Sequence, residues 1–133
     1  MRHASFNFIN DLVLEVTFGS QVPTEEAFEM YLAELLRIYK ESNQGIIVIF
    51  NSEESKFVPS KLRKRQAQWM KDNEVIIREK CLMCVYVIPN LLIKFILEAI
   101  FLIQKSPVHY EIVKSTEKAK YLIDQLIPET SAA

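Results

Sequence analysis

Glycine is scarce in this chain of 133 residues, which contains only Gly19 and Gly45. At an average usage of roughly 7%, a chain of this length would hold about nine glycines. The dinucleotide-binding and P-loop fingerprints need several closely spaced glycines, because the backbone must turn tightly and approach a phosphate. The sequence therefore excludes the common glycine-rich nucleotide-binding loops.

Residues that bind metals or act as nucleophiles are also few. The two cysteines and two histidines are Cys81, Cys84, His3 and His109, and their spacing matches no zinc site. His3 lies close to the N-terminus, where we expect a mobile segment, and no G-x-S-x-G elbow is present. We predict a protein that has no metal or cofactor and is not an enzyme.

Neither sign of charge dominates the chain, which has sixteen basic and seventeen acidic residues. Such a balance gives no global field that would attract nucleic acid, so we expect no nucleic-acid partner. The first eleven residues lack the apolar core of a signal peptide, which predicts a cytoplasmic protein. The length favours a single domain over residues 1–133, with a frayed tail at 129–133.

Half of the residues are apolar, and they recur in regular patterns. Alternating residues around Asn10-Asp11 predict a hairpin with a two-residue turn. Further strands are expected at 46–50, 81–88 and 109–113, and helices at 24–42, 60–71, 91–105 and 115–127. The order ββαβαβαβα predicts an α/β protein with a mixed sheet of about five strands, an opening hairpin followed by parallel strands, and about four helices.

Two details of this pattern concern individual side chains. Cys81 and Cys84 lie three apart in an expected strand and should point to opposite faces, so we interpret them as buried thiols that do not pair. Thr24, Ser60 and Ser115 each precede an expected helix and are predicted N-caps.

The segment Leu91–Lys105 is the most apolar of the chain. As a helix it would reach ~22 Å, less than the ~30 Å hydrocarbon core, so no transmembrane segment is predicted. Apolar residues surround most of this helix, which is therefore either doubly buried or exposed to a partner. The candidate residues for self-association in a homodimer, or for an apolar surface, are Leu92, Phe95, Ile96 and Phe101.

The element order and the segment Ile46–Leu62 resemble the STAS family, the sulphate transporter and anti-sigma factor antagonist domains. The likeness is to the SpoIIAA-like branch of uncharacterised bacterial proteins. In that segment an apolar strand runs through a loop to Phe57-Val-Pro-Ser60 and directly into a helix. The resemblance implies a SpoIIAA-like fold and places Ser60 at the position that a partner kinase phosphorylates in the antagonists.

Ser60 has two interpretations in the sequence. As an N-cap its hydroxyl would satisfy an orphan backbone N–H group. As a phosphoserine it would place negative charge beside Lys61, Arg63 and Lys64 at a helix N-terminus, which is a favourable arrangement. The same basic residues are either a solvated helix face or a site for an anionic partner.

We therefore predict a regulatory protein-binding module that resembles the anti-sigma factor antagonists. Phe57, Ser60, Lys61, Arg63 and Lys64 are the candidate contacts to an anion or to a protein partner of the anti-sigma factor or kinase type. The alternative function is a carrier or sensor that binds a small apolar molecule or lipid beneath the helix at 91–105. A pocket with bound lipid in the purified protein would favour the alternative, whereas co-purification of a kinase or an anti-sigma factor would favour the regulatory module.

Overall fold

The computed structural model describes residues 2–126, which form five strands and five helices. The strands are β1 (Ala4–Phe8), β2 (Val13–Phe18), β3 (Ile46–Asn51), β4 (Cys81–Val87) and β5 (Tyr110–Val113). The helices are α1 (Glu25–Glu41), α2 (Ser60–Asp72), α3 (Glu74–Lys80), α4 (Leu91–Ile103) and α5 (Thr116–Leu126). The predicted frayed tail at 129–133 lies outside the described residues.

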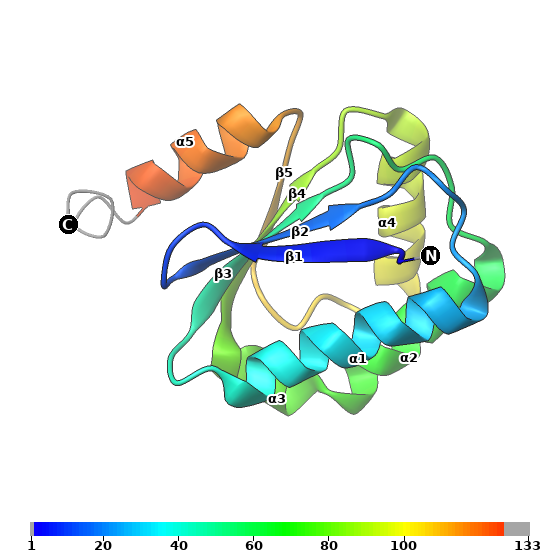
Figure 1. The fold of residues 1–133 in the computed structure, drawn as a ribbon. Coiled ribbons are helices and arrows are strands. Elements are labelled where there is room, and N and C mark those ends of the chain that lie inside the picture. The colour runs from blue at the N-terminus through cyan, green and yellow to red at the C-terminus, as the bar shows by residue number, and fades with distance from the viewer. Residues whose placement is uncertain (1, 127–133) are drawn as a thin grey trace.

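The five strands form one mixed sheet in the order β1-β2-β3-β4-β5. β1 and β2 are antiparallel, and each later strand is parallel to the one before it. Each parallel strand is added on the same side of the strand before it. Because the crossover connections between these strands all have the same hand, their helices lie on the same face of the sheet. Accordingly α1, α2, α3 and α4 share one apolar core with one face of the sheet, and α5 packs on the other (Figure 1). The α/β class and the mixed sheet are as predicted.

β3 lies at the centre of the sheet, and all six of its residues are buried. Ile46, Val48 and Phe50 face α1 to α4, whereas Ile47 and Ile49 face α5. Because successive side chains of a strand alternate between faces, a strand covered on both sides must be apolar throughout. This explains the continuous β-branched run in the sequence.

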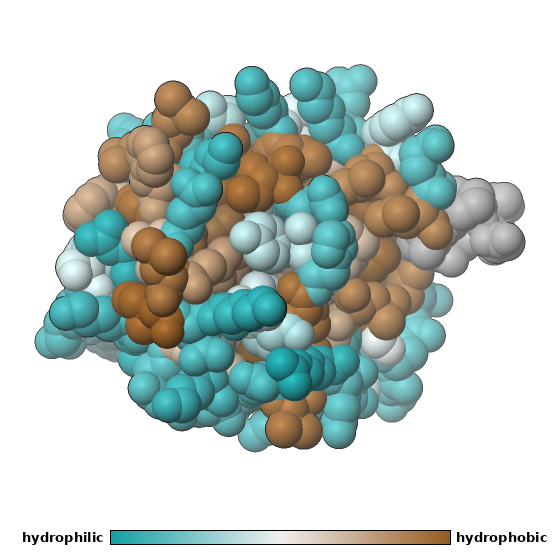
Figure 2. Space-filling model, turned by 180° about the vertical axis from the view of Figure 1, so that it is seen from behind, coloured by the Kyte–Doolittle hydropathy of each residue, from teal (hydrophilic) through white to brown (hydrophobic). Residues whose placement is uncertain are grey.

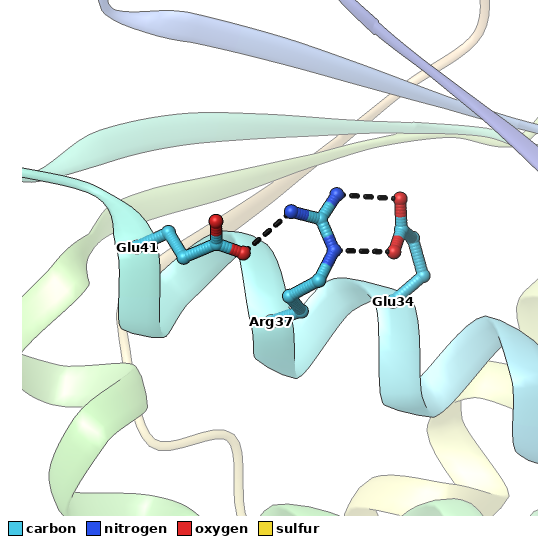
Figure 3. Close-up of polar contacts among 3 residues, drawn as sticks. All are labelled: Glu34, Arg37 and Glu41. Carbon is cyan, nitrogen blue, oxygen red and sulfur yellow. Dashed lines mark hydrogen bonds and ion pairs between the residues drawn. The ribbon is translucent and has the colours of Figure 1, made fainter.

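α1 begins as predicted, because the Thr24 hydroxyl accepts a hydrogen bond from the Ala27 amide at 3.1 Å. On its exposed side Arg37 holds Glu34 through two hydrogen bonds of 2.8 Å and also contacts Glu41 (Figure 3). Residues three and four apart on a helix are surface neighbours, so these pairs support the helix locally. They lie far from the sheet and leave the opposite side of α1 apolar.

Three local predictions need correction. The hairpin loop between β1 and β2 spans residues 9–12, because the Asn10 side chain accepts hydrogen bonds from the Leu12 and Val13 amides and widens the predicted two-residue turn. The second predicted helix, at 60–71, is followed after a break at Asn73 by a separate helix, α3, which gives five helices instead of about four. The amide of Asn73 ends α2 by donating to the Trp69 carbonyl.

The third correction concerns the two thiols, whose sulfur atoms lie 3.6 Å apart on the same face of the sheet. Ile46 pairs with Cys81 and Ile47 with Met83, so Leu82 is an extra residue in β4. Such a bulge shifts the alternation by one position. Cys81 and Cys84 therefore both point toward α1, and the prediction of opposite faces was wrong.

The same bulge sets the environment of Gly45. A Cβ atom at this position would lie 2.7 Å from Cδ2 of Leu82, whereas one at Gly19 would meet only the His3 carbonyl oxygen at 3.8 Å. We expect Gly45→Ala to lower the free energy of unfolding by about 1 kcal/mol relative to Gly19→Ala. Urea unfolding measures both variants. If the clash is the cause, the difference disappears in a Leu82→Ala background, and a difference that persists there contradicts this explanation.

Candidate functional site

An apolar cavity of about 120 Å³ lies between the sheet and helices α1, α2 and α4. Its walls are predominantly apolar and unusually rich in aromatic rings. The aromatic lining residues are Phe18, Phe28, Tyr31, Tyr39, Phe50, Trp69, Tyr86 and Phe101. α4 contributes Ile93, Ile96, Leu97 and Ile100 from the opposite wall. Ser52, Ser55, Gln66 and Ser106 supply polar groups among the lining residues.

Three rings from neighbouring strands form the floor of this cavity. Phe50 of β3 stacks between Phe18 of β2, at a centroid distance of 6.2 Å, and Tyr86 of β4, at 5.1 Å. Phe50 and Tyr86 are partners in the sheet register, whereas Phe18 lies diagonally from Phe50, two positions beyond its partner Val16. Aromatic pairs at these distances are favourable.

His3 forms part of the same aromatic cluster. Its ring lies 5.0 Å from that of Phe18, 5.6 Å from Phe28 and 5.5 Å from Tyr31. It is 9% exposed, and among the described residues its Nδ1 atom has no hydrogen-bond partner. Loss of water around the ring lowers its pKa from 6.5 to about 4, so His3 is neutral at pH 7. The expectation of a mobile N-terminal histidine was wrong, because β1 ties this segment to the sheet.

The other titratable groups of the cavity are also neutral at pH 7. Burial is the main cause that raises the pKa values of the Tyr31, Tyr39 and Tyr86 hydroxyls. The pKa of Cys84 is raised by its hydrogen bond with Cys81 and by burial. An uncharged, aromatic wall favours apolar molecules and offers no charged side chain that would pair with an ion.

The second candidate site, around Ser60, is arranged differently from the prediction. α2 begins at Ser60 itself, Pro59 occupies the N-cap position, and no side-chain capping hydrogen bond is made. The backbone carbonyl of Pro59 accepts from the Leu62 and Arg63 amides instead. Ser60 is thus an exposed residue of the first helical turn and not the predicted cap.

Two of the five basic residues of α2 pair with acidic residues of α1. Lys61 pairs with Glu25, and Arg65 binds both oxygens of Glu29 at 2.6 and 2.9 Å. The hydrogen bond from Arg65 lowers the pKa of Glu29. The acidic first turn of α1 therefore offsets much of the positive charge at the start of α2, and an external anion is not needed for this purpose.

The remaining residues of this region lie on the surface. The Arg63 guanidinium sits 5.8 Å from the ring centre of Phe57, in the geometry of a cation–π contact. Phe57 is 40% exposed, and Lys64 is exposed. The structure therefore brings Phe57 and Arg63 together and leaves Ser60 and Lys64 accessible to solvent.

The four residues predicted for the surface of α4 divide into two groups. Leu92 and Phe95 are exposed. Ile96 is buried, and Phe101 is half-buried against Tyr110 at a centroid distance of 4.7 Å. Phe95 and Ile96 are consecutive, so their side chains differ by about 100° around the helix axis, and one faces solvent while the other faces the core. Ile96 and Phe101 therefore belong to the cavity wall.

Within residues 2–126 no three metal-ligating side chains come together, and none of the helices formed there has the length and apolar character needed to cross a membrane. A scan against protein-family models finds no matching family. Searches of the curated proteins and of the solved structures also find no match.

Proposed function

We propose that this protein binds a small apolar molecule in the cavity between the sheet and α4, as a carrier or sensor. The observation that carries the proposal is the cavity of about 120 Å³ with neutral, largely aromatic walls. Close-packed cores contain few voids larger than a water molecule. An apolar void of this size loses contacts that a ligand would restore, which favours occupation.

The dimensions of the cavity restrict the class of ligand. An apolar cavity of roughly 150 Å³ stays dry and accepts benzene, whereas drug-sized molecules need roughly 300 Å³ or more. The ligand is therefore a single or fused aromatic ring, or a short aliphatic chain, and it carries no net charge. Indole and toluene are suitable probes of this class.

Calorimetric titration with indole tests the proposal in wild type and in two variants of α4. Ile100 lines the cavity, so Ile100→Phe fills it, whereas Leu102 is 89% exposed, so Leu102→Phe adds the same ring outside. We expect saturable binding to wild type and Leu102→Phe, and binding at least about tenfold weaker to Ile100→Phe, which is a loss of about 1.4 kcal/mol.

Circular dichroism must show that Ile100→Phe remains folded, since overpacking costs about 1–3 kcal/mol. If Ile100→Phe is unstable, Ile96→Met offers a milder change of volume in the same wall. Equal affinity of all variants, or no binding to wild type, would overturn the proposal.

A second candidate function is the STAS-like regulatory module, which contacts a cytoplasmic protein partner of the anti-sigma factor or kinase type and is switched by phosphorylation of Ser60. It is supported by the exposed hydroxyl of Ser60 in the first turn of α2, beside the accessible Lys64. Two negative charges at this point would interact favourably with the helix N-terminus.

Phosphopeptide mass spectrometry of the protein isolated from its native cell tests this second candidate. We expect phosphate on Ser60 of wild type and its loss in Ser60→Ala, whereas Ser106→Ala, which changes a half-buried serine of another loop, keeps it. A Ser60 peptide that remains unmodified in all growth phases would exclude the switch.

A further inference from the structure

α4 carries apolar residues on both of its sides. Ile93, Ile96 and Ile100 are buried and face the cavity. On the opposite side five large apolar side chains are exposed, by 48% to 89%. They are Leu91, Leu92, Phe95, Leu102 and Ile103. Figure 2, seen from behind the view of Figure 1, shows hydrophobic side chains on the surface where α4 lies.

These exposed residues form one continuous stripe, which we call the α4 stripe. At about 100° per residue, Leu91, Phe95 and Leu102 fall on one line along the helix, and Leu92, Ala99 and Ile103 fall on the neighbouring line. The stripe therefore runs the whole length of the helix, from Leu91 to Ile103. A stripe of this extent on a charge-balanced protein indicates an interaction surface.

The charges beside the α4 stripe indicate what covers it. Lys94 and Glu98 are exposed neighbours along one border of the stripe. Within the part of the chain that the structure describes, neither of them forms an ion pair. The border thus presents a positive group followed by a negative group along the helix. The same border on a second helix that runs in the opposite direction would place its negative group beside the positive one.

We propose that the α4 stripe is the contact surface of a homodimer, in which the α4 helices of two copies pack antiparallel about a two-fold axis. In this arrangement Lys94 of each copy lies opposite Glu98 of the other, so two ion pairs form along the same border. A parallel two-fold arrangement would instead place the two charged borders on opposite sides of the interface, where Lys94 and Glu98 of different copies could not pair.

The apolar residues fit the same alignment. Reversing one helix so that Lys94 opposes Glu98 also brings Leu91 near Leu102 of the second copy, and Leu92 near Ile103. Phe95 then lies near the two-fold axis, two residues in height from Phe95 and from Ala99 of the second copy, so the two phenylalanines meet at the centre of the interface. Apolar side chains of the two stripes thus pack against each other, and the two-fold axis repeats each contact between different residues twice.

A charge-swap series in sedimentation velocity tests the dimer. We expect Lys94→Glu and Glu98→Lys each to weaken the dimer about tenfold, because each creates two like-charge contacts, and the double swap to restore it. Lys118→Glu reverses an exposed charge on α5 and should leave the dimer unchanged. Leu102→Glu places two charges in the interface and should yield a monomer.

Several outcomes would overturn the proposal. A wild-type protein that stays monomeric at all concentrations contradicts it, as does a double swap that remains as weak as the single variants. Binding of a monomeric protein to vesicles of neutral phosphatidylcholine would assign the α4 stripe to a lipid surface instead. Ile100→Phe changes the cavity and not the stripe, so the indole titration and the dimer measurement can fail separately.

Discussion

Phe50→Ala is expected to lower the free energy of unfolding by about 3–5 kcal/mol, the largest effect of a single substitution considered for this chain. Phe50 is 6% exposed and stacks between Phe18 and Tyr86. Its removal deletes both ring contacts and extends the cavity into the centre of the sheet. Urea unfolding followed by fluorescence of Trp69 measures the loss.

Phe8→Ala is the matched control for this substitution. Phe8 lies at the end of β1 and is 48% exposed, so its loss should cost less than about 1 kcal/mol. Because a ligand stabilises the state that binds it, indole should also recover part of the stability that Phe50→Ala loses. Equal losses in the two variants would show that the aromatic floor is not the centre of the core.

The second large effect is a dependence of stability on pH that arises from His3. The unfolded chain binds a proton at His3 near pH 6.5, whereas the folded protein resists this until about pH 4. The contribution of His3 to stability is therefore complete above pH 6.5 and falls as the pH decreases toward 4. At pH 5 the loss relative to pH 7 is expected to be about 2 kcal/mol.

His3→Phe isolates this contribution, since phenylalanine keeps an aromatic ring beside Phe18, Phe28 and Tyr31 and removes the titration. Carboxylates with lowered pKa values, such as Glu29 and Glu34, also stabilise the folded state, and this contribution is lost below about pH 4.5 in both proteins. The difference between wild type and His3→Phe, measured by thermal unfolding between pH 5 and 7, thus reports on His3 alone. Parallel pH profiles of the two proteins would contradict the burial of a neutral histidine.

Much of the fold could be predicted because its causes are local. Thr24 and Ser115 cap α1 and α5 as expected, since the capping serine or threonine needs only an amide three residues later. The uninterrupted apolar run of β3 identifies the central strand by composition alone. The length and composition of α4 likewise follow from a segment that no turn residue interrupts.

The features that could not be predicted depend on contacts between distant segments. The bulge at Leu82 arises from the register of β4 against β3, and it alone brings the sulfur atoms of Cys81 and Cys84 together. His3 is buried because α1 and β2 supply the rings around it. The cavity exists because large rings from three strands do not fill the space beneath α4, and no pattern within one segment reports this.

The first residue of α2 could not be predicted because two adjacent residues both suit the N-cap position. Serine before an apolar stripe is a strong N-cap signal, but the backbone geometry of Pro59 suits the N-cap position equally well. The helix therefore begins one residue earlier than the capping pattern implies. The shift of one residue leaves the Ser60 side chain without the predicted capping role. It also places the hydroxyl at the surface, where a kinase could reach it.

Binding of an apolar molecule beneath α4 is tested most directly by a methyl NMR titration of isoleucine-labelled protein with indole. Ile93, Ile96 and Ile100 line the cavity, and Ile103 on the same helix is 56% exposed and serves as an internal control. The proposed function predicts saturable shifts of the three lining isoleucines with little change at Ile103. Shifts confined to Ile103, or no saturable shift at any isoleucine, would contradict it.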